Sequence, residues 1–95
     1  MKDKQLTLTV RAREQLLYSG PVNSITSFND KGKFDVLELH ANFISIIKNI
    51  LIIREINGNT REIKLEGGIM RVVKDKVDVY LGVKQSPEKE RKLKS

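Results

Sequence analysis

The stretch from residue 43 to residue 53, FISIIKNILII, constrains the fold more than any other part of this sequence. Eight of its eleven residues are apolar, and six of the eleven are isoleucine. A strand with one solvated face alternates apolar and polar residues, so this density predicts a strand buried on both faces, interrupted near Lys48 and Asn49. A short buried helix is the alternative. We favour the strand because β-branched isoleucine lowers helix propensity.

Most of the remaining sequence repeats a pattern of short strands separated by turns. In 5–10, QLTLTV, the apolar residues Leu6, Leu8 and Val10 alternate with polar ones, which is typical of a strand with one wet face. About nine or ten such strands, with turn signals every 8–12 residues, predict an all-β fold, a small β-sandwich or barrel. The further strands are expected at 14–20, 22–28, 33–39, within a hairpin over 54–67, at 67–73 and at 77–83.

Glycine and asparagine mark the expected turns. Residues 29–32, NDKG, have the composition typical of a turn. Asn57-Gly58 predicts a hairpin with a type I′ turn, because both residues tolerate the positive φ angles that this turn needs. A second hairpin with a tighter turn is expected over 67–83. The pair Gly67-Gly68 opens a strand, which indicates a bulge or a close approach of two backbones.

Length and charge bound the possible functions. The 95 residues suffice for one small domain, which we place at 1–83, followed by a basic polar tail at 84–95. The net charge is +6, and the tail contributes +3 of it. Such a tail is expected to be solvated, with nucleic acid or an anionic membrane as the alternative partner. Nucleic acid is disfavoured because aromatic residues are few, and Phe28, Phe34 and Phe43 are expected in the core.

Cysteine and targeting segments are missing from this sequence. Without cysteine there is no disulfide framework and no thiolate metal site, which fits a reducing compartment. The N-terminal residues lack the continuous apolar run of a secretory signal. The run 43–53 is too short for a membrane helix, so we expect a soluble chain with no direct membrane insertion.

Motifs for catalysis and cofactor binding are also missing. Neither a P-loop nor a G-x-G-x-x-G sequence occurs, and the carboxylates are scattered over polar strand positions, so no cofactor and no metal is expected. The single histidine, His40, could form a triad with Ser24 or Ser45 and Asp35. A strand-end histidine that hydrogen-bonds nearby backbone is the simpler interpretation. We expect no catalytic residue and no enzyme activity.

Four short motifs, in this order and at these separations, resemble one known family. They are YSGPVNSI (18–25), GKFDVLELHA (32–41), EGGIMRV (66–72) and VDVYL (77–81). Together they resemble the N-terminal β-sandwich of the epsilon subunit of F-type ATP synthases, called delta in mitochondria. The resemblance covers about residues 5–83.

The resemblance implies a role in the rotor of the synthase. It implies a non-catalytic central-stalk subunit that binds the gamma subunit with one face and the c ring with one end. Such a subunit would lie on the cytoplasmic side of the cell membrane as a peripheral part of the complex, with no small-molecule substrate. By resemblance, the residues expected at the c-ring contact are Gly32, Lys33, Phe34, Glu38 and His40.

Several positions depart from the family pattern. Lys33 stands where the family usually has an acid, Asp35 where it has glycine, and Glu38-Leu39 where it has Pro-Gly. Like charges would oppose docking, so Lys33 implies either a changed ring surface or a lost contact. The family's C-terminal helical hairpin and its ATP-binding motif have no match here, so an inhibitory or nucleotide-sensing role is not implied.

Two other functions compete with the rotor role. A β-sandwich protein-binding module outside the synthase should be polar all round, whereas a stalk subunit should expose an apolar patch. A binder of nucleic acid or anionic membrane acting through 84–95 should lose affinity steeply with salt.

Overall fold

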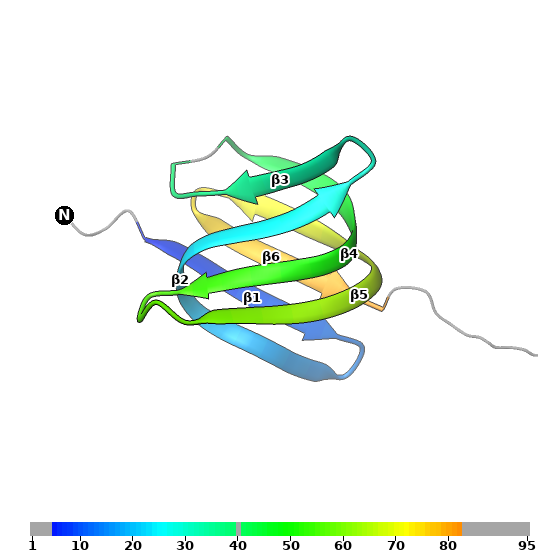
Figure 1. Ribbon diagram of the computed structural model, residues 1–95, viewed down its shortest axis with the longest axis horizontal. Coiled ribbons are helices and arrows are strands. Elements are labelled where there is room, and N and C mark those ends of the chain that lie inside the picture. The colour runs from blue at the N-terminus through cyan, green and yellow to red at the C-terminus, as the bar shows by residue number, and fades with distance from the viewer. Residues whose placement is uncertain (1–4, 40, 83–95) are drawn as a thin grey trace, which may run out of the picture.

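The computed structural model describes residues 5–39 and 41–82, and these form six β-strands without a helix (Figure 1). The expected all-β class is confirmed, but the expectation of nine or ten short strands is wrong. The strands are β1 (Leu6–Ala12), β2 (Gln15–Asn29), β3 (Gly32–Val36), β4 (Phe43–Glu55), β5 (Thr60–Val73) and β6 (Lys76–Leu81).

The count is lower because three long strands continue through positions that resembled boundaries. β2 runs through Gly20-Pro21, β4 through Lys48-Asn49 and β5 through Gly67-Gly68. The register between β4 and β5 shifts between Ile47 and Asn49, which marks a bulge. A bulge bends a strand and increases its twist without ending it. Each long strand can therefore contribute its two halves to different layers.

A hydroxyl group completes the hydrogen bonding at the bend of β4. Asn49 has a φ of 75°, and the register between β2 and β4 shifts between Thr26 and Phe28. The Ser27 hydroxyl is fully buried and donates to the carbonyl oxygen of Ile50 at 2.8 Å. A buried carbonyl without a partner is costly, so this contact stabilises the bent ladder.

Strand β2 closes the sheet on itself. The strand order is β1-β6-β5-β4-β2-β3, and β1 additionally pairs with β2. The first half of β2 pairs with β1, while its second half lies between β3 and β4. β1 and β6 are parallel, and the other pairs are antiparallel. The result is a small closed barrel flattened into a sandwich, with β3 on its margin (Figure 1).

The core lies between the two layers and is built by inward positions of the alternating strands. Leu6, Leu8 and Val10 of β1 are buried, as their alternation predicts. Phe34 and Phe43 are half-buried and pack against the core, whereas Phe28 is half-buried and is not among the residues packed against it, so the expectation of three core phenylalanines is only partly met. The buried apolar residues are Leu6, Leu8, Val10, Val22, Ile25, Val36, Ile47, Leu51, Ile53, Met70, Val72, Val77 and Val79.

Both expected hairpins form, and the second has the tighter turn that was predicted, but the turn type of the first differs from the prediction. At Asn57-Gly58 the Gly58 N–H donates to the carbonyl of Glu55, and Gly58 alone of the pair has a positive φ, 95°. That geometry is a type I turn followed by a left-handed glycine, not a type I′ turn. The I′ pattern occurs between β5 and β6, where Lys74 and Asp75 have φ angles of 49° and 66°.

Gly68 lies where two backbones approach closely, as expected. A Cβ atom at this position would lie 2.8 Å from the carbonyl oxygen of Tyr80 and 2.9 Å from Cδ2 of Leu81. Both distances are below any normal contact, so glycine is required for β6 to pack at this point.

Candidate partner-binding surfaces

The outer side of β4, β5 and β6 carries exposed apolar side chains. Ile46 pairs with Ile69, and Ile69 pairs with Tyr80, so these three lie in one row across three strands. Ile44 is two positions before Ile46 on the same face of β4. We call Ile44, Ile46, Ile69 and Tyr80 the outer apolar band. Their exposed fractions are 69%, 74%, 37% and 44%.

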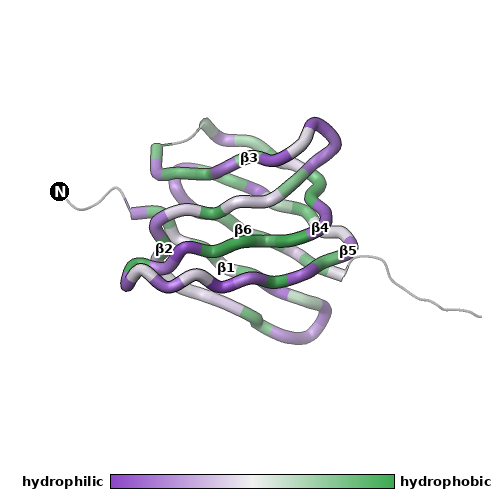
Figure 2. Tube along the Cα trace, viewed as in Figure 1, coloured by the Kyte–Doolittle hydropathy of each residue, from purple (hydrophilic) through white to green (hydrophobic). Residues whose placement is uncertain are grey.

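The band corrects the interpretation of 43–53. In the first half of β4 the inner face is buried at Ile47, whereas Ile44 and Ile46 face solvent. The prediction of burial on both faces is therefore wrong for this half. In Figure 2 the hydrophobic colour runs along much of β4, while the β2–β3 turn is hydrophilic. Contiguous exposed apolar side chains of this kind mark interaction sites.

A second exposed apolar surface lies on the loop between β3 and β4. Leu37 and Leu39 are 53% and 68% exposed, with exposed Glu38 between them. We call residues 37–39 the leucine loop. Leu39 has a φ of 64°, an uncommon conformation for a bulky residue that costs about 1–2 kcal/mol.

The β5–β6 turn holds this loop in place. The Leu39 N–H donates to Oδ1 of Asp75 at 2.6 Å, and the Lys74 N–H donates to Oδ1 of Asn42 at 2.8 Å. The carbonyl of Asp75 in turn accepts from the N–H of Thr7 at 2.9 Å. Strained conformations persist where their surroundings hold them, and they often accompany binding sites. The leucine loop is thus a fixed feature of one end of the sheet.

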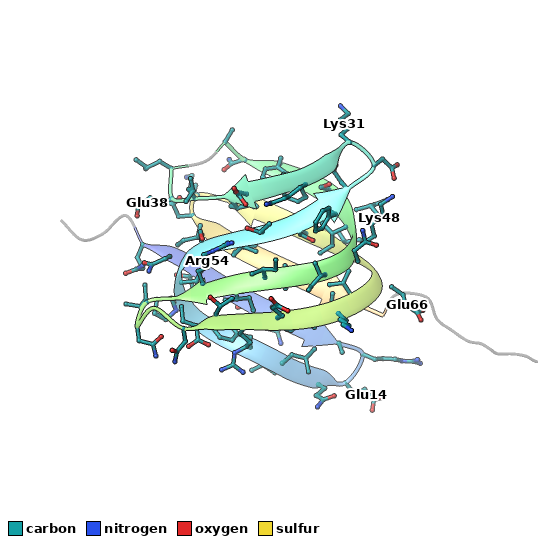
Figure 3. All side chains as sticks on the ribbon, viewed as in Figure 1. Glu14, Lys31, Glu38, Lys48, Arg54 and Glu66 are labelled. Atoms are coloured by element: carbon teal, nitrogen blue, oxygen red, sulfur yellow. The ribbon has the colours of Figure 1, made fainter. Side chains whose placement is uncertain are left out.

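The residues expected at the ring contact are spread along β3. Gly32 and Lys33 lie at the β2–β3 turn, and Phe34 is half-buried with its ring edge-on to Phe43 at 6.1 Å. Glu38 lies beyond the opposite end of β3; Figure 3 shows it far from Lys31, the neighbour of Gly32. The last of the expected residues, His40, lies outside the described residues.

Polar side chains link the outer face of β3, β2 and β4. The buried Thr26 hydroxyl donates to Oδ1 of Asp35 at 2.5 Å and accepts from Nη1 of Arg54 at 2.7 Å. Arg54 also lies 3.5 Å from Oγ of Ser24, and Figure 3 shows it on the front face. Ser24 and Asp35, two residues of the hypothetical triad, are thus engaged with Arg54 and Thr26 rather than with each other. The other candidate, Ser45, accepts from Asn29 at 3.2 Å.

The described residues offer little for chemistry. No group of three or more metal-ligating side chains lies together among them. Burial raises the pKa of Tyr18, the Glu55 carboxylate adds to the rise, and Arg61 opposes it. Tyr18 therefore keeps its proton at neutral pH. No helix in the described part of the chain is long and apolar enough to cross a membrane.

A closed all-β domain with two exposed apolar surfaces in its described part has features typical of a protein-binding module. Its sequence identifies which one. Residues 5–82 match the family model of the ATP synthase delta/epsilon chain, β-sandwich domain, so the chain belongs to this family. The resemblance seen in the four motifs is confirmed, and so is the expectation of a non-catalytic subunit, because the matched family is the delta/epsilon chain of ATP synthase.

Solved structures agree with this assignment. A chain in the mitochondrial ATP synthase of Euglena gracilis (OSCP/F1/c-ring) is 25% identical, with a TM-score of 0.76. A chain in the central stalk/c-ring structure of Tetrahymena thermophila mitochondrial ATP synthase shares the fold, with a TM-score of 0.69 at 15% identity. The matches cover 82% and 85% of this chain, but 51% and 66% of those chains. No curated protein sequence matches it.

The sequence interpretation missed the exposed apolar residues of both surfaces. Ile44 and Ile46 were assigned to the core, and the resemblance pointed to Glu38 and His40 rather than to Leu37 and Leu39. The sequence did show an unusual density of isoleucine over 43–53, but it did not show which of these residues face outward.

Proposed function

We propose that this chain is a non-catalytic central-stalk subunit of an F-type ATP synthase, which couples the gamma subunit to the c ring. The observation that carries this proposal is the presence of two separate exposed apolar surfaces on one closed sheet. A subunit that connects two partners needs two surfaces and a stiff body between them. Family membership and the central-stalk assignment of the Tetrahymena structure support the same role.

The outer apolar band is the proposed gamma-binding face. A stable interface has an apolar centre and a polar rim. The band supplies the centre, and the Arg71–Asp78 ion pair beside it, at 3.9 Å, supplies part of the rim. A β-sandwich module outside the synthase was expected to be polar all round, so the band supports the stalk role over that alternative.

The leucine loop and β3 form the proposed ring-facing end. Leu37 and Leu39 supply exposed apolar contacts, and Glu38 and Lys33 supply opposite charges at the two ends of β3. In this proposal the contact extends along β3 from Gly32 to Leu39, with His40 assigned to it by resemblance alone. The subunit would lie peripherally on the cytoplasmic side of the membrane, within the complex.

Co-purification with the gamma subunit of the same organism tests this function. A one-to-one complex that persists at physiological salt is expected, because an apolar contact is insensitive to screening. Ile46→Asp should abolish it, since the carboxylate would be buried without a partner. Ile56→Asp is the matched control, because Ile56 is 48% exposed in the β4–β5 turn, away from the band. Failure of the unmodified chain to bind gamma at any salt concentration would refute the proposal.

A further inference from the structure

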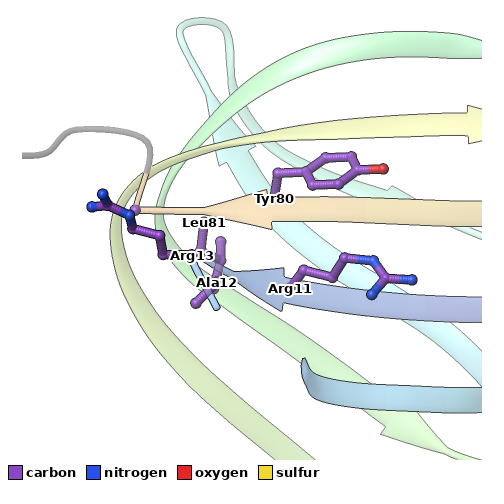
Figure 4. A pocket seen from close by; sticks show the side chains of 6 residues that line it. Arg11, Ala12, Arg13, Tyr80 and Leu81 are labelled. Carbon is purple, nitrogen blue, oxygen red and sulfur yellow. The ribbon is translucent and has the colours of Figure 1, made fainter. Parts of the chain in front are cut away.

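The row of the outer apolar band ends at an arginine. Tyr80 of β6 pairs with Arg11 of β1, so the row Ile46, Ile69, Tyr80 continues directly to Arg11. Arg11, Tyr80 and Arg13 of the β1–β2 turn line a shallow depression of about 470 Å³, which Ala12, Leu81 and Gly82 complete (Figure 4). The depression therefore lies between the outer apolar band and the positively charged side chains of Arg11 and Arg13.

These two arginines differ from the other arginines of the described residues. Arg61 pairs with Glu55 at 2.9 Å, Arg71 pairs with Asp78 at 3.9 Å, and Arg54 is bonded to Thr26. Neither Arg11 nor Arg13 has an ion pair or a side-chain hydrogen bond within the described part of the chain. Both are exposed, and Glu14, the acid next to Arg13, forms no ion pair with either of them.

We infer that the partner which covers the outer apolar band presents Asp or Glu side chains to Arg11 and Arg13. This inference rests on the proposed function, in which that partner is the gamma subunit. Covering Tyr80 removes water from the neighbouring Arg11 guanidinium (Figure 4), and a buried charge without a partner is strongly unfavourable. Carboxylates match guanidinium groups with paired, charge-assisted hydrogen bonds, so they are the chemistry that fits.

The sheet geometry specifies where the acids lie on the partner. Neighbouring strands are about 4.8 Å apart, so the three steps from Ile46 to Arg11 span about 14 Å across the sheet. The partner surface therefore has an apolar contact over Ile46 and Ile69, and a carboxylate about 14 Å from the first of them. Electrostatic attraction at this end would also accelerate association at low salt.

Binding kinetics with the gamma subunit of the same organism test the inference. Arg11→Gln/Arg13→Gln keeps two polar, exposed side chains and removes two charges. We expect about a ten-fold loss of affinity at low salt and a flatter dependence of the association rate on salt. Lys31→Gln/Lys64→Gln is the matched control, because it removes the same charge from two exposed side chains outside the outer apolar band and the proposed ring-facing end. It should change the affinity for gamma by less than about two-fold.

Each result has a distinct meaning. If the unmodified chain binds gamma and the two double variants behave alike, the inference is wrong while the proposed function stands. If the unmodified chain does not bind gamma, the proposed function fails and the inference fails with it. Vesicles of phosphatidylcholine and phosphatidylglycerol serve as the other probe. If the two arginines are needed for vesicle binding and not for gamma, they recognise lipid phosphate and the inference is overturned.

Discussion

Replacing Thr26 by valine removes the hydroxyl that connects the edge strand β3 to the body of the sheet. Valine has nearly the volume of threonine and a high strand propensity, so the packing of this fully buried position should persist. The hydroxyl makes two bonds to charged groups, one to Asp35 and one from Arg54. Bonds to charged groups contribute about 1.5–3 kcal/mol each.

The expected loss is smaller than the sum of the two bonds. Asp35 and Arg54 are both exposed, so each can turn towards water once the hydroxyl is gone. We therefore expect a decrease in the free energy of unfolding of about 2 kcal/mol, out of the 5–15 kcal/mol typical of a domain. For a domain of this size that decrease lowers Tm by about 8–16 °C.

Urea denaturation followed by circular dichroism measures this change. The m-value should stay constant, since the same surface is exposed on unfolding. Thr7→Val is the control, because the Thr7 side chain is exposed on β1; it should change stability by less than about 0.5 kcal/mol. Equal stability of the two variants would refute the reasoning, and the three side chains would then be neighbours without energetic coupling.

Three further predictions follow from the structure. Gly68→Ala should destabilise the fold by about 1–3 kcal/mol, seen in the same urea titration, because its methyl group would collide with the backbone of Tyr80. An unchanged midpoint would contradict the close approach. Leu39→Gly should keep or raise Tm, because glycine adopts the positive φ of this position without strain, and it should weaken binding to the isolated c ring. A variant that loses Tm together with ring binding would count against a contact role for Leu39. Desolvation, with Glu55 adding, raises the folded-state pKa of Tyr18 above 10.0. The protonated Tyr18 therefore contributes stability that is complete below pH 10 and is lost as the pH rises through the folded-state pKa. The free energy of unfolding of the unmodified chain should fall more steeply above pH 10 than that of Tyr18→Phe. If the stabilities of the two proteins fall in parallel above pH 10, Tyr18 makes no pH-dependent contribution.

Local alternation was sufficient to predict which residues face the core in the simple strands. Leu6, Leu8 and Val10 are buried, and so are Val77 and Val79 on β6, because each of these strands belongs to one layer throughout. In such a strand the period of two is uninterrupted, and the pattern of the sequence is the pattern of the structure.

The bent strands were not predictable by the same reasoning. At Lys48-Asn49 a polar pair in an apolar run suggested an end, but the strand continues there with a bulge and a buried Ser27 hydroxyl. A bulge and a turn use similar residues, so local chemistry does not distinguish them. The distinction depends on whether β2 and β5 lie alongside to continue the ladder, which is a tertiary property.

The candidate surfaces were missed for a related reason. Isoleucine in a strand is interpreted as core because burial of apolar side chains is the dominant stabilising term. Ile44 and Ile46 are nevertheless outward, and hydrophobicity alone cannot separate an intrachain core from an interchain one. That separation requires knowing which face of β4 the other layer covers.

The hydrogen bonds between the β5–β6 turn and the segment that holds the leucine loop have a mechanical consequence. The loop is followed within a few residues by Phe43 and Ile44, the start of β4 and of the outer apolar band. A force applied at the loop therefore reaches the band through a short segment of chain, and it is also carried by Asp75 and Asn42 into β5 and β6. Because β4 and β5 share a long ladder, such a load acts on many backbone hydrogen bonds at once instead of opening them one after another. A coupling between two partners that passes through this domain would be stiff, with little elastic delay between one surface and the other.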